Sequence, residues 1–593
     1  MKKIIYSFLL VGLLSGCYED KGNYEYTLDS MNEITSVAFS PSIATTGEGQ
    51  VIEIQQALNE NDTKRRVDVI MEQTLADNFN NLDFNWHITY DTPDGKSIDE
   101  TIYSKGFLEL ELPVNEEMTY NVFLKIYDTT TTLSHYSGFK IKTRPLFKNS
   151  LFVLHGEEGE RMLGNIEVIG NDTKIYTDVR VVTPENKYND YSNAIGLSYA
   201  TFQNGGWDDM AQEHVKTEVK RTLIVFNNGD GTTAYNPYGM NAKFEENGIL
   251  KPKSSNFVFK KMIQTGASEN NKLYRIALSE NGDVYVGNFT HALYKPGYKC
   301  EINASDDRHQ SDYCITAATI TYRRFVFWDA KNNRFLYSVK EDNAKHNFAK
   351  YEHYANMEEF SEEPVLDANV DFSTLQKSPK GMTAVFGYIN FSQGETKDEN
   401  GNSQELYAKQ DPYFIFKDED TGDLYRYQLT EILFEGEKSR KTRSASEEKR
   451  PTFTIQGKKL EGILPECDTS TLTYNTDFET DYLFYSDGKT IYRYDVRNGN
   501  NIPMYIAPDG YKITMMKFRL DDSNSFCNDI RRILSIGLYN ETAQTGAVAE
   551  IKFNTAADLD EDFEPLFYDK DNEGNSFGKI KDLQFVYELN YKI

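Results

Sequence analysis

Hydrophobic and polar residues alternate one by one in several stretches of residues 31–145. Tyr120, Val122, Leu124 and Ile126 fall on one face of an extended chain, and Asn121, Phe123, Lys125 and Tyr127 fall on the other. This period of two predicts a half-buried β-strand. Residues 51–54, 84–88 and 138–142 predict further strands, and Asp94-Gly95 predicts a turn. Residues 31–145 are therefore predicted to form a β-sandwich domain.

Residues 146–593 show another pattern, in which short hydrophobic strands recur in pairs around a turn. The clearest pairs join residues 273–276 to 284–286, 325–328 to 335–337, 413–416 to 424–427 and 482–485 to 491–494; looser pairs begin near residues 151, 223 and 533. A four-stranded unit that recurs at about 40–50 residues indicates a β-propeller. We predict seven blades, with six or eight as alternatives, and stacked β-sandwiches as the alternative fold.

The last strand, residues 582–587, has a predicted place in this ring. Ring closure protects strand edges, and a terminal strand of the chain often completes the first blade. The predicted fold class is therefore all-β, with an N-terminal Ig-like sandwich followed by a propeller over residues 146–593.

The N-terminal residues predict export and lipid attachment. Lys2 and Lys3 precede an apolar run that ends at Leu14, and this run is shorter than the roughly 18 residues of a membrane-spanning helix. Leu14-Ser15-Gly16-Cys17 resembles the lipobox of bacterial lipoproteins, which implies cleavage after residue 16 and acylation of Cys17. Residues 1–16 are then a signal peptide, and residues 17–30 a lipidated tether. The alternative is an ordinary secretory signal.

Composition narrows the classes of partner. The chain of 593 residues carries a net charge of −28, which argues against nucleic-acid binding and against direct adhesion to anionic lipid. The predicted contact with a membrane is through the lipid alone. Aromatic residues make up 13% of the chain, and tyrosine and phenylalanine favour strands over helices.

The four cysteines beyond Cys17 allow two disulfides in an exported protein. The candidate pairs are Cys300 with Cys314 and Cys467 with Cys527; four free thiols are the alternative. No Cys-x-x-Cys sequence is present, so a zinc site is not expected.

Catalytic and metal-binding patterns give no assignment. Neither His-Glu-x-x-His nor a phosphate-binding loop occurs. The stretch Asp569-Lys570-Asp571-Asn572-Glu573-Gly574 begins like a calcium loop, but its twelfth position is Ile580 instead of glutamate. We interpret it as an acidic turn, and predict no catalytic residue, metal ligand or cofactor.

Aromatic residues in predicted loops are the candidate ligand-binding residues. Trp207, Tyr235, Tyr238 and Tyr294 lie in loops that also contain Asn, Asp or Gly, and Tyr188 and Tyr191 form a similar pair. Such rings stack on sugars or hold peptide side chains, while amides donate hydrogen bonds. The alternative is that these rings pack between blades.

Three features together resemble the PKD-like lipoproteins of Bacteroidota. They are the lipobox followed by "CYEDKGNYEY", the Ig-like segments "FNWHITYDTPDG" and "YNVFLKIYD", and the long all-β remainder. The resemblance implies a location on the outer membrane, facing the cell exterior. It also implies partners, a SusC-like TonB-dependent transporter and a SusD-like lipoprotein.

The expected function is therefore non-enzymatic. The protein is expected to assist uptake of a peptide or glycan nutrient by binding the ligand or docking on the transporter. A propeller-type polysaccharide hydrolase or lyase is the main alternative, since carboxylates are abundant. A surface adhesin is a further alternative.

Overall fold

The chain divides into two compact units in a computed structural model, residues 1–144 and Pro145–Ile593. The boundary predicted from the sequence, after residue 145, lies one residue from the observed one. The structure describes residues 32–46, 49–57, 61, 63–74, 79–92, 94–114, 117–169, 172–183, 186–208, 213–227, 231–235, 240, 259–264, 274–279, 282, 284–288, 314–320, 324–339, 365–367, 369–373, 375–397, 403–432, 452–475, 477–478, 480–519 and 528–586.

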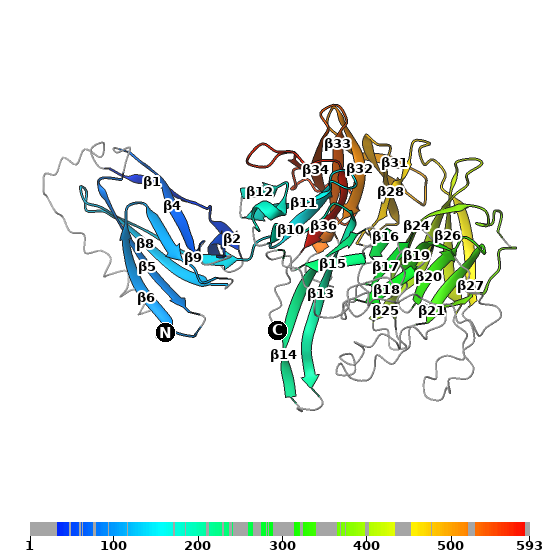
Figure 1. The fold of residues 1–593 in the computed structure, drawn as a ribbon, viewed down its shortest axis with the longest axis horizontal. Coiled ribbons are helices and arrows are strands. Elements are labelled where there is room, and N and C mark those ends of the chain that lie inside the picture. Colours follow the sequence, from blue (N-terminus) through cyan, green and yellow to red (C-terminus); the bar gives the residue numbers. More distant parts are fainter. Residues whose placement is uncertain are drawn as a thin grey trace, which may run out of the picture. The chain divides into compact units, whose positions relative to one another are not determined.

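The first unit is a sandwich of two β-sheets (Figure 1). Its strands are β1 (Ile34–Ser40), β2 (Ala44–Thr46), β3 (Gly49–Gln55), β4 (Lys64–Gln73), β5 (Leu82–Asp91), β6 (Ser97–Ser104), β7 (Phe107–Glu111), β8 (Thr119–Asp128) and β9 (Ser134–Arg144). One sheet has the order β1-β4-β7 and the other β2-β3-β9-β8-β5-β6. Strands β3 and β9 are parallel, and the other pairs are antiparallel.

The core of this unit follows the predicted alternation. Inward residues of β8 are buried and outward residues are exposed or half-buried, in the order read from the sequence. Trp86 of β5 is fully buried, and its ring lies 6.4 Å from that of Phe39 in the opposite sheet. Apolar side chains from both sheets thus form one interior, as in Ig-like sandwiches.

The second unit begins with strands whose sheets follow one another along the chain (Figure 1). These are β10 (Ser150–His155), β11 (Met162–Ile169), β12 (Asp172–Tyr176), β13 (Ala194–Asp208), β14 (Glu213–Asn227), β15 (Gly231–Tyr235), β16 (Phe259–Gln264), β17 (Tyr274–Ser279), β18 (Val284–Asn288), β19 (Ile315–Ile320), β20 (Arg324–Asp329), β21 (Arg334–Val339) and β22 (Val365–Asp367).

The remaining strands are β23 (Asn369–Val370), β24 (Thr383–Lys397), β25 (Ser403–Lys417), β26 (Leu424–Ile432), β27 (Thr452–Lys459), β28 (Asp468–Tyr474), β29 (Tyr482–Ser486), β30 (Thr490–Asp495), β31 (Asn501–Ile506), β32 (Tyr511–Phe518), β33 (Ile533–Asn540), β34 (Thr545–Lys552), β35 (Leu566–Tyr568) and β36 (Ile580–Val586). Helical structure among the described residues consists of a 3-10 turn, η2 (Val179–Val181), and α3 (Asn528–Arg531). In that described part of the chain, no helix has the length and apolarity needed to cross a membrane.

The described strands of the second unit group into seven sheets that form a ring. The sheet orders are β12-β11-β10-β36, β13-β14-β15, β16-β17-β18, β19-β20-β21-β22, β23-β27-β26-β25-β24, β28-β29-β30-β31 and β32-β33-β34-β35. Neighbouring sheets contact each other through β36 and β13, β13 and β16, β17 and β19, β19 and β24, β24 and β28, and β28 and β32. β32 and β33 then contact β36, which returns to the first sheet. The unit is therefore a β-propeller; the blade number of the whole chain stays a prediction.

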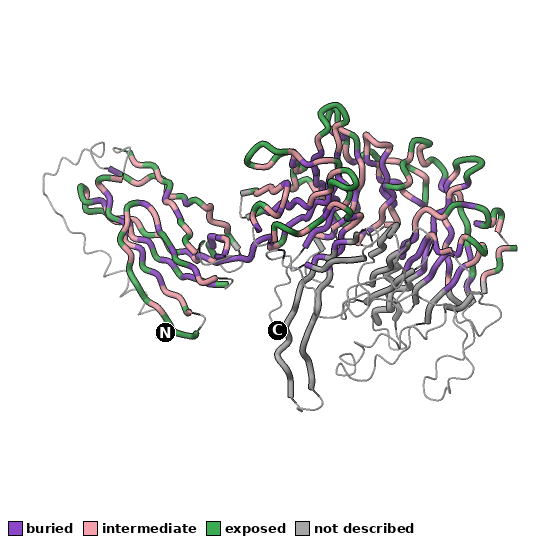
Figure 2. The backbone as a smooth tube through the Cα atoms, viewed as in Figure 1, coloured by how far each residue is buried: buried purple, intermediate pink, exposed green. Residues whose placement is uncertain are grey.

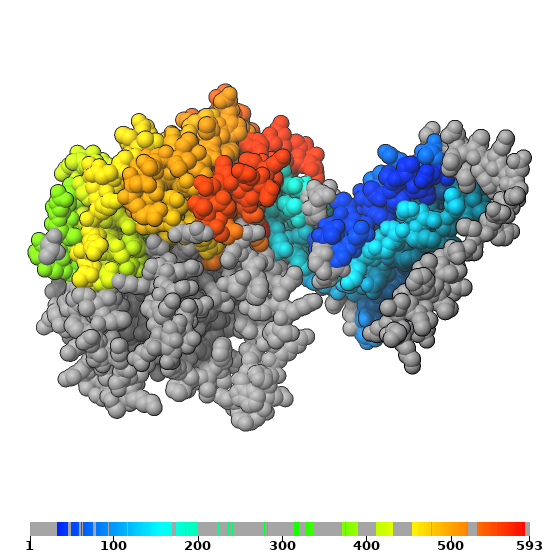
Figure 3. All heavy atoms as spheres, turned by 180° about the vertical axis from the view of Figure 1, so that it is seen from behind, coloured from blue at the N-terminus to red at the C-terminus, as the bar shows by residue number. Residues whose placement is uncertain are grey.

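The C-terminal strand closes this ring as the sequence predicts. β36 pairs antiparallel with β10, so the last strand completes the sheet formed by the first three strands of the unit. Figure 3 shows the C-terminal residues (red) beside those of the first sheet (cyan). Asp582 also contacts both neighbouring sheets: its carboxylate accepts from the Leu197 backbone N–H at 2.7 Å and lies 3.2 Å from the Lys517 ammonium.

Local sequence explains the strands and turns of each sheet. Central strands such as β10 and β33 are buried over six consecutive residues, and apolar residues hold most of these positions (Figure 2). Predicted turns place Gly422 and Gly488 at φ of +75° and +91°, a backbone region that glycine adopts without strain.

Candidate functional site

Two of the four predicted ligand-binding aromatics lie in the described part of the chain. Trp207 belongs to β13, where its backbone is in register with His214 of β14. Tyr235 is the last residue of β15. Tyr238 and Tyr294 lie outside the described residues, as does Cys17.

Tyr235 packs inside the propeller, which corrects its prediction as an exposed binding residue. The side chain is only 3% exposed, and its ring centroid lies 5.7 Å from that of the buried Tyr191. Its backbone pairs with Leu223 in the middle of the sheet. Neighbouring side chains cover the Tyr235 ring, so the ring contributes to packing and is not open to a ligand.

Trp207 and Tyr235 do not belong to one site. Tyr235 pairs with Leu223, which pairs with Tyr199 on β13. Trp207 lies eight residues further along β13, which corresponds to about 26 Å of strand. Beyond Leu223, β14 pairs only with β13 among the described strands, and the two form a ribbon that projects from its sheet (Figure 1).

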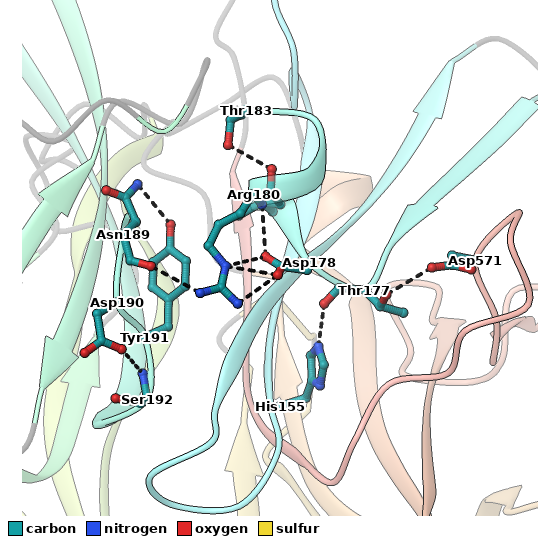
Figure 4. Close-up of polar contacts among 11 residues, drawn as sticks. His155, Thr177, Asp178, Arg180, Thr183, Asn189, Asp190, Tyr191, Ser192 and Asp571 are labelled. Atoms are coloured by element: carbon teal, nitrogen blue, oxygen red, sulfur yellow. Dashed lines mark hydrogen bonds and ion pairs between the residues drawn. The ribbon is translucent and has the colours of Figure 1, made fainter. Parts of the chain in front are cut away.

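Hydrogen bonds between Asp178 and Arg180 hold the first part of the segment between β12 and β13 in place (Figure 4). Asp178 caps η2 by accepting from the Arg180 backbone N–H at 3.0 Å. The same carboxylate accepts from Arg180 Nε at 2.9 and 3.0 Å and from Nη2 at 2.8 Å. Hydrogen bonding to Asp178 raises the pKa of Arg180 above its usual value. A doubly bonded guanidinium–carboxylate pair fixes direction as well as distance, so it orients this turn.

Asn189 and Tyr191 hold the other end of this segment. Asn189 Nδ2 donates to the Met240 carbonyl at 2.9 Å and to the Tyr191 hydroxyl at 3.3 Å, while its own carbonyl accepts from Arg180 at 3.5 Å. Burial and the nearby Tyr235 raise the pKa of Tyr191, so its hydroxyl stays protonated. The adjacent Asp190 accepts from the Ser192 backbone N–H at 2.9 Å, which lowers the pKa of that carboxyl.

The segment between β12 and β13 also carries two exposed apolar side chains. Tyr188 is 85% exposed and Val181 is 69% exposed. The Lys187 ammonium lies 5.1 Å from the Tyr188 ring centroid. The sequence had grouped Tyr188 with Tyr191, but the structure separates them, because Tyr191 belongs to the interior. The segment thus holds the Tyr188 ring in solvent.

His155 connects this region to the closing strand of the ring (Figure 4). The buried imidazole donates from Nε2 to the Thr177 carbonyl at 2.7 Å, and Nδ1 accepts from the Gly578 backbone N–H at 2.9 Å. The Thr177 hydroxyl donates to Asp571 at 3.0 Å. These bonds join β10, the end of β12 and the turn before β36.

That turn also contains a Gly-x-Ser-x-Gly sequence, Gly574 to Gly578, which inspection of the sequence had missed. A nucleophile elbow requires a strand followed by a helix. Here Ser576 forms an isolated bridge with Lys570 in a turn that leads into a strand. His155 is near this turn, but both of its nitrogens already have backbone partners. The arrangement therefore serves to shape the turn and does not form a catalytic triad.

The acidic turn of residues 569–574 uses its carboxylate internally. Asp571 accepts from the backbone N–H groups of Glu573 and Asn575, from the Asn575 amide and from Thr177. Burial alone would raise the pKa of Asp571, but the hydrogen bonds together lower it by more. The pKa therefore lies below its usual value. Within the described residues, no group of three His, Cys, Asp or Glu side chains is placed to hold a metal ion.

The neutral state of His155 predicts a pH-dependent stability. Burial lowers its pKa below the usual 6.5. Below about pH 6.5 the unfolded chain binds a proton here that the folded chain excludes, so stability should fall as pH decreases from 6.5 towards the folded pKa. In H155Q the amide can replace both hydrogen bonds without titrating. We expect a flatter dependence of the urea midpoint on pH between 7.5 and about 5. Equal dependence in both proteins would contradict this assignment.

Each predicted disulfide joins one cysteine that the structure describes to one that it does not. Cys467 is half-buried, and burial raises the pKa of its thiol to about 12. Its candidate partner Cys527 lies outside the described residues, as does Cys300, the candidate partner of the half-buried Cys314. The two pairings stay predictions.

Comparison with known protein families finds a match for the N-terminal part of the chain. Residues 17–186 match the model of the PKD-like family. The match begins at Cys17, spans the first unit and continues through β10–β12 of the propeller. No curated protein matches the chain.

Solved structures similar to the chain share little sequence with it. A quinonprotein alcohol dehydrogenase-like protein from Bacteroides thetaiotaomicron aligns over 90% of this chain and 96% of its own, with 8% identity and a TM-score of 0.35. The WD40 domain of SCAP from fission yeast aligns over 74% and 84%, with 10% identity and a TM-score of 0.28. The propeller assignment rests on the closed order of sheets in this chain. The predicted likeness to the PKD-like family is confirmed for residues 17–186.

Proposed function

We propose that this protein is a non-enzymatic lipoprotein of the outer cell surface that assists a SusC/SusD-like uptake system. The observation that carries the proposal is the extent of the PKD-like match, which begins at Cys17, the residue that the signal pattern predicts as acylated. A lipid on Cys17 would hold the two units at a membrane without a spanning helix.

The propeller supplies surfaces suited to docking. The β13–β14 ribbon projects from its sheet, and the segment between β12 and β13 exposes Tyr188 on a base fixed by Arg180 and Asp178. Tyrosine at an exposed, pre-organised position is a frequent anchor in protein interfaces. These features support a role in contacting a partner or its cargo, a peptide or a glycan.

The test is a pull-down from native outer membranes in mild detergent, with a C-terminal tag on the chain. We expect a TonB-dependent transporter and a SusD-like lipoprotein to be recovered in fixed ratio. The C17S variant should leave the membrane fraction, since it lacks the acylated thiol. Y188A should reduce recovery of the partners without changing membrane association.

Two outcomes would contradict the proposal in different ways. Membrane association of C17S equal to that of the natural chain would refute lipid anchoring at Cys17. Recovery of the natural chain without either partner would refute the uptake role. Turnover of a glycan by the purified chain would instead support the hydrolase or lyase alternative.

A further inference from the structure

The outer face of β8 and β9 in the first unit differs in composition from the chain as a whole. We call it the β8–β9 outer face. Its outward positions are Thr119, Asn121, Phe123, Lys125 and Tyr127 on β8, and Ser134, Tyr136, Gly138, Lys140 and Lys142 on β9. These ten positions hold three lysines, three aromatic residues and no carboxylate, although the chain carries a net charge of −28.

The aromatic rings of this face lie side by side and are open to solvent. Phe123 is 48% exposed and Tyr136 is 55% exposed. Their ring centroids are 5.7 Å apart, with an angle of 30° between the planes. Exposed rings of this size usually mark a contact surface, because leaving them in water costs free energy that burial in the core would recover.

A cation lies among these rings. Lys125 pairs across the strands with Tyr136, and its ammonium lies 6.0 Å from the Tyr136 ring centroid and 5.6 Å from that of Tyr127. Lys140 lies one pair beyond the Phe123–Gly138 pair on the same face. Lys142 has Glu53 beside it on the parallel strand β3, so Lys125 and Lys140 are the lysines on which the inference depends.

Gly138 leaves room next to Phe123. The two residues pair across β8 and β9, and a Cβ added to Gly138 would have only Phe123 Cδ2 within 4 Å, at 3.8 Å. The Gly138 position therefore contributes no side chain beside the Phe123 ring. The face thus combines adjacent exposed aromatic rings with the positive charges of Lys125 and Lys140.

We infer that the β8–β9 outer face binds an acidic polysaccharide. The C–H faces of sugar rings pack on aromatic rings, and the carboxylates of uronic acid residues match the lysine ammonium groups in charge. A protein partner fits less well, because lysine is depleted in protein interfaces and arginine is enriched. Asp83 of β5, in register with Tyr127, and Glu53 of β3 border the face. Charges that lie farther away than a Debye length, about 8 Å at physiological salt, are screened.

The experiment measures binding of the full chain to soluble polygalacturonate, with dextran as the uncharged probe. We expect binding to polygalacturonate that weakens as salt rises, and little binding to dextran. Replacing the ring in Y136A or F123A should weaken binding by about tenfold or more, and K125Q/K140Q should remove most of the salt dependence.

G138V separates binding from folding. Valine favours a strand, and its Cβ meets only an ordinary contact, so the fold should be kept while the side chain covers Phe123. We expect G138V to lose binding as F123A does, with an unchanged thermal transition. I506A, which removes an apolar side chain that is 64% exposed on the propeller, is the matched control and should bind normally.

Three results would overturn the inference. Absence of binding to polygalacturonate would exclude this ligand class. Binding that is equal in G138V and the natural chain would place the ligand elsewhere. Binding to vesicles of phosphatidylglycerol but not to polygalacturonate would identify a lipid surface instead. None of these results bears on whether a transporter is recovered in the pull-down, so the two proposals fail separately.

Discussion

A chain that ends at Lys579 is expected to lose the fold of its second unit. It lacks β36, whose apolar side chains Ile580, Leu583, Phe585 and Val586 are buried. Each buried side chain of this kind contributes about 1.5–3 kcal/mol. Without β36, β10 keeps a neighbour on one side only, and the contacts that β36 makes with both adjacent sheets are lost. We expect aggregation, or the absence of a cooperative urea transition for this unit.

The matched control ends at Val586. It removes only residues 587–593 and keeps the whole of β36. This shorter deletion should unfold like the natural chain. A peptide of residues 580–593, added during refolding, should partly restore the transition of the chain that ends at Lys579. If the two truncated chains had the same urea midpoint, β36 would not be needed for ring closure.

Replacing Arg426 is expected to give a large loss of stability in the ring. Arg426 of β26 forms an ion pair with Asp481 at the next sheet, and both side chains are largely buried, 14% and 13% exposed. Its Nη1 also donates to the Tyr388 hydroxyl at 3.1 Å, and its guanidinium lies 4.5 Å from the Tyr413 ring centroid. Removing one partner of a buried pair leaves a desolvated charge and costs about 3–5 kcal/mol.

A double-mutant cycle tests this reason. We expect R426M to lower the free energy of unfolding in urea by about 3–5 kcal/mol, and R426M/D481L to recover much of that loss because neither charge then remains buried. R497Q is the control, since Arg497 is 66% exposed beside Asp495, and surface pairs contribute at most about 1 kcal/mol. A double variant as unstable as R426M would show that packing of the arginine, rather than its charge, is what matters.

Arg493 repeats this arrangement one sheet further on. Its guanidinium lies 4.7 Å from the Tyr482 ring centroid, and Nη1 bonds Asp558 of the following sheet region at 2.6 Å. Arg426 pairs in register with Ile415, two residues after Tyr413, and Arg493 pairs with Phe484, two residues after Tyr482. In both hairpins a Tyr-Arg sequence, Tyr425-Arg426 and Tyr492-Arg493, thus supplies an ion pair to the next sheet, which the sequence pattern alone did not reveal.

Several features were predictable because they depend on neighbours in the chain. Alternation along β8 separated its buried from its exposed residues, and turns such as Thr421-Gly422 and Asp487-Gly488 separated the strands of hairpins. Recurrence of the hairpins indicated the propeller, and the final strand was assigned correctly to the first sheet. These patterns are local, since the period of side chains on a strand and the conformation of a turn are set by adjacent residues.

Other features were decided only by the tertiary structure, because they depend on residues far apart in the chain. Tyr188 and Tyr191 have similar sequence surroundings, but the packing of Tyr235 beside Tyr191 buries one ring and leaves the other in solvent. Phe123 was recognised as an outward residue, while its neighbours Tyr136 and Gly138 are set by the register of β8 with β9. Sequence by itself determined which residues face outward; the pairing of strands decided which of them share a surface, because long-range register brings together residues that no local pattern connects.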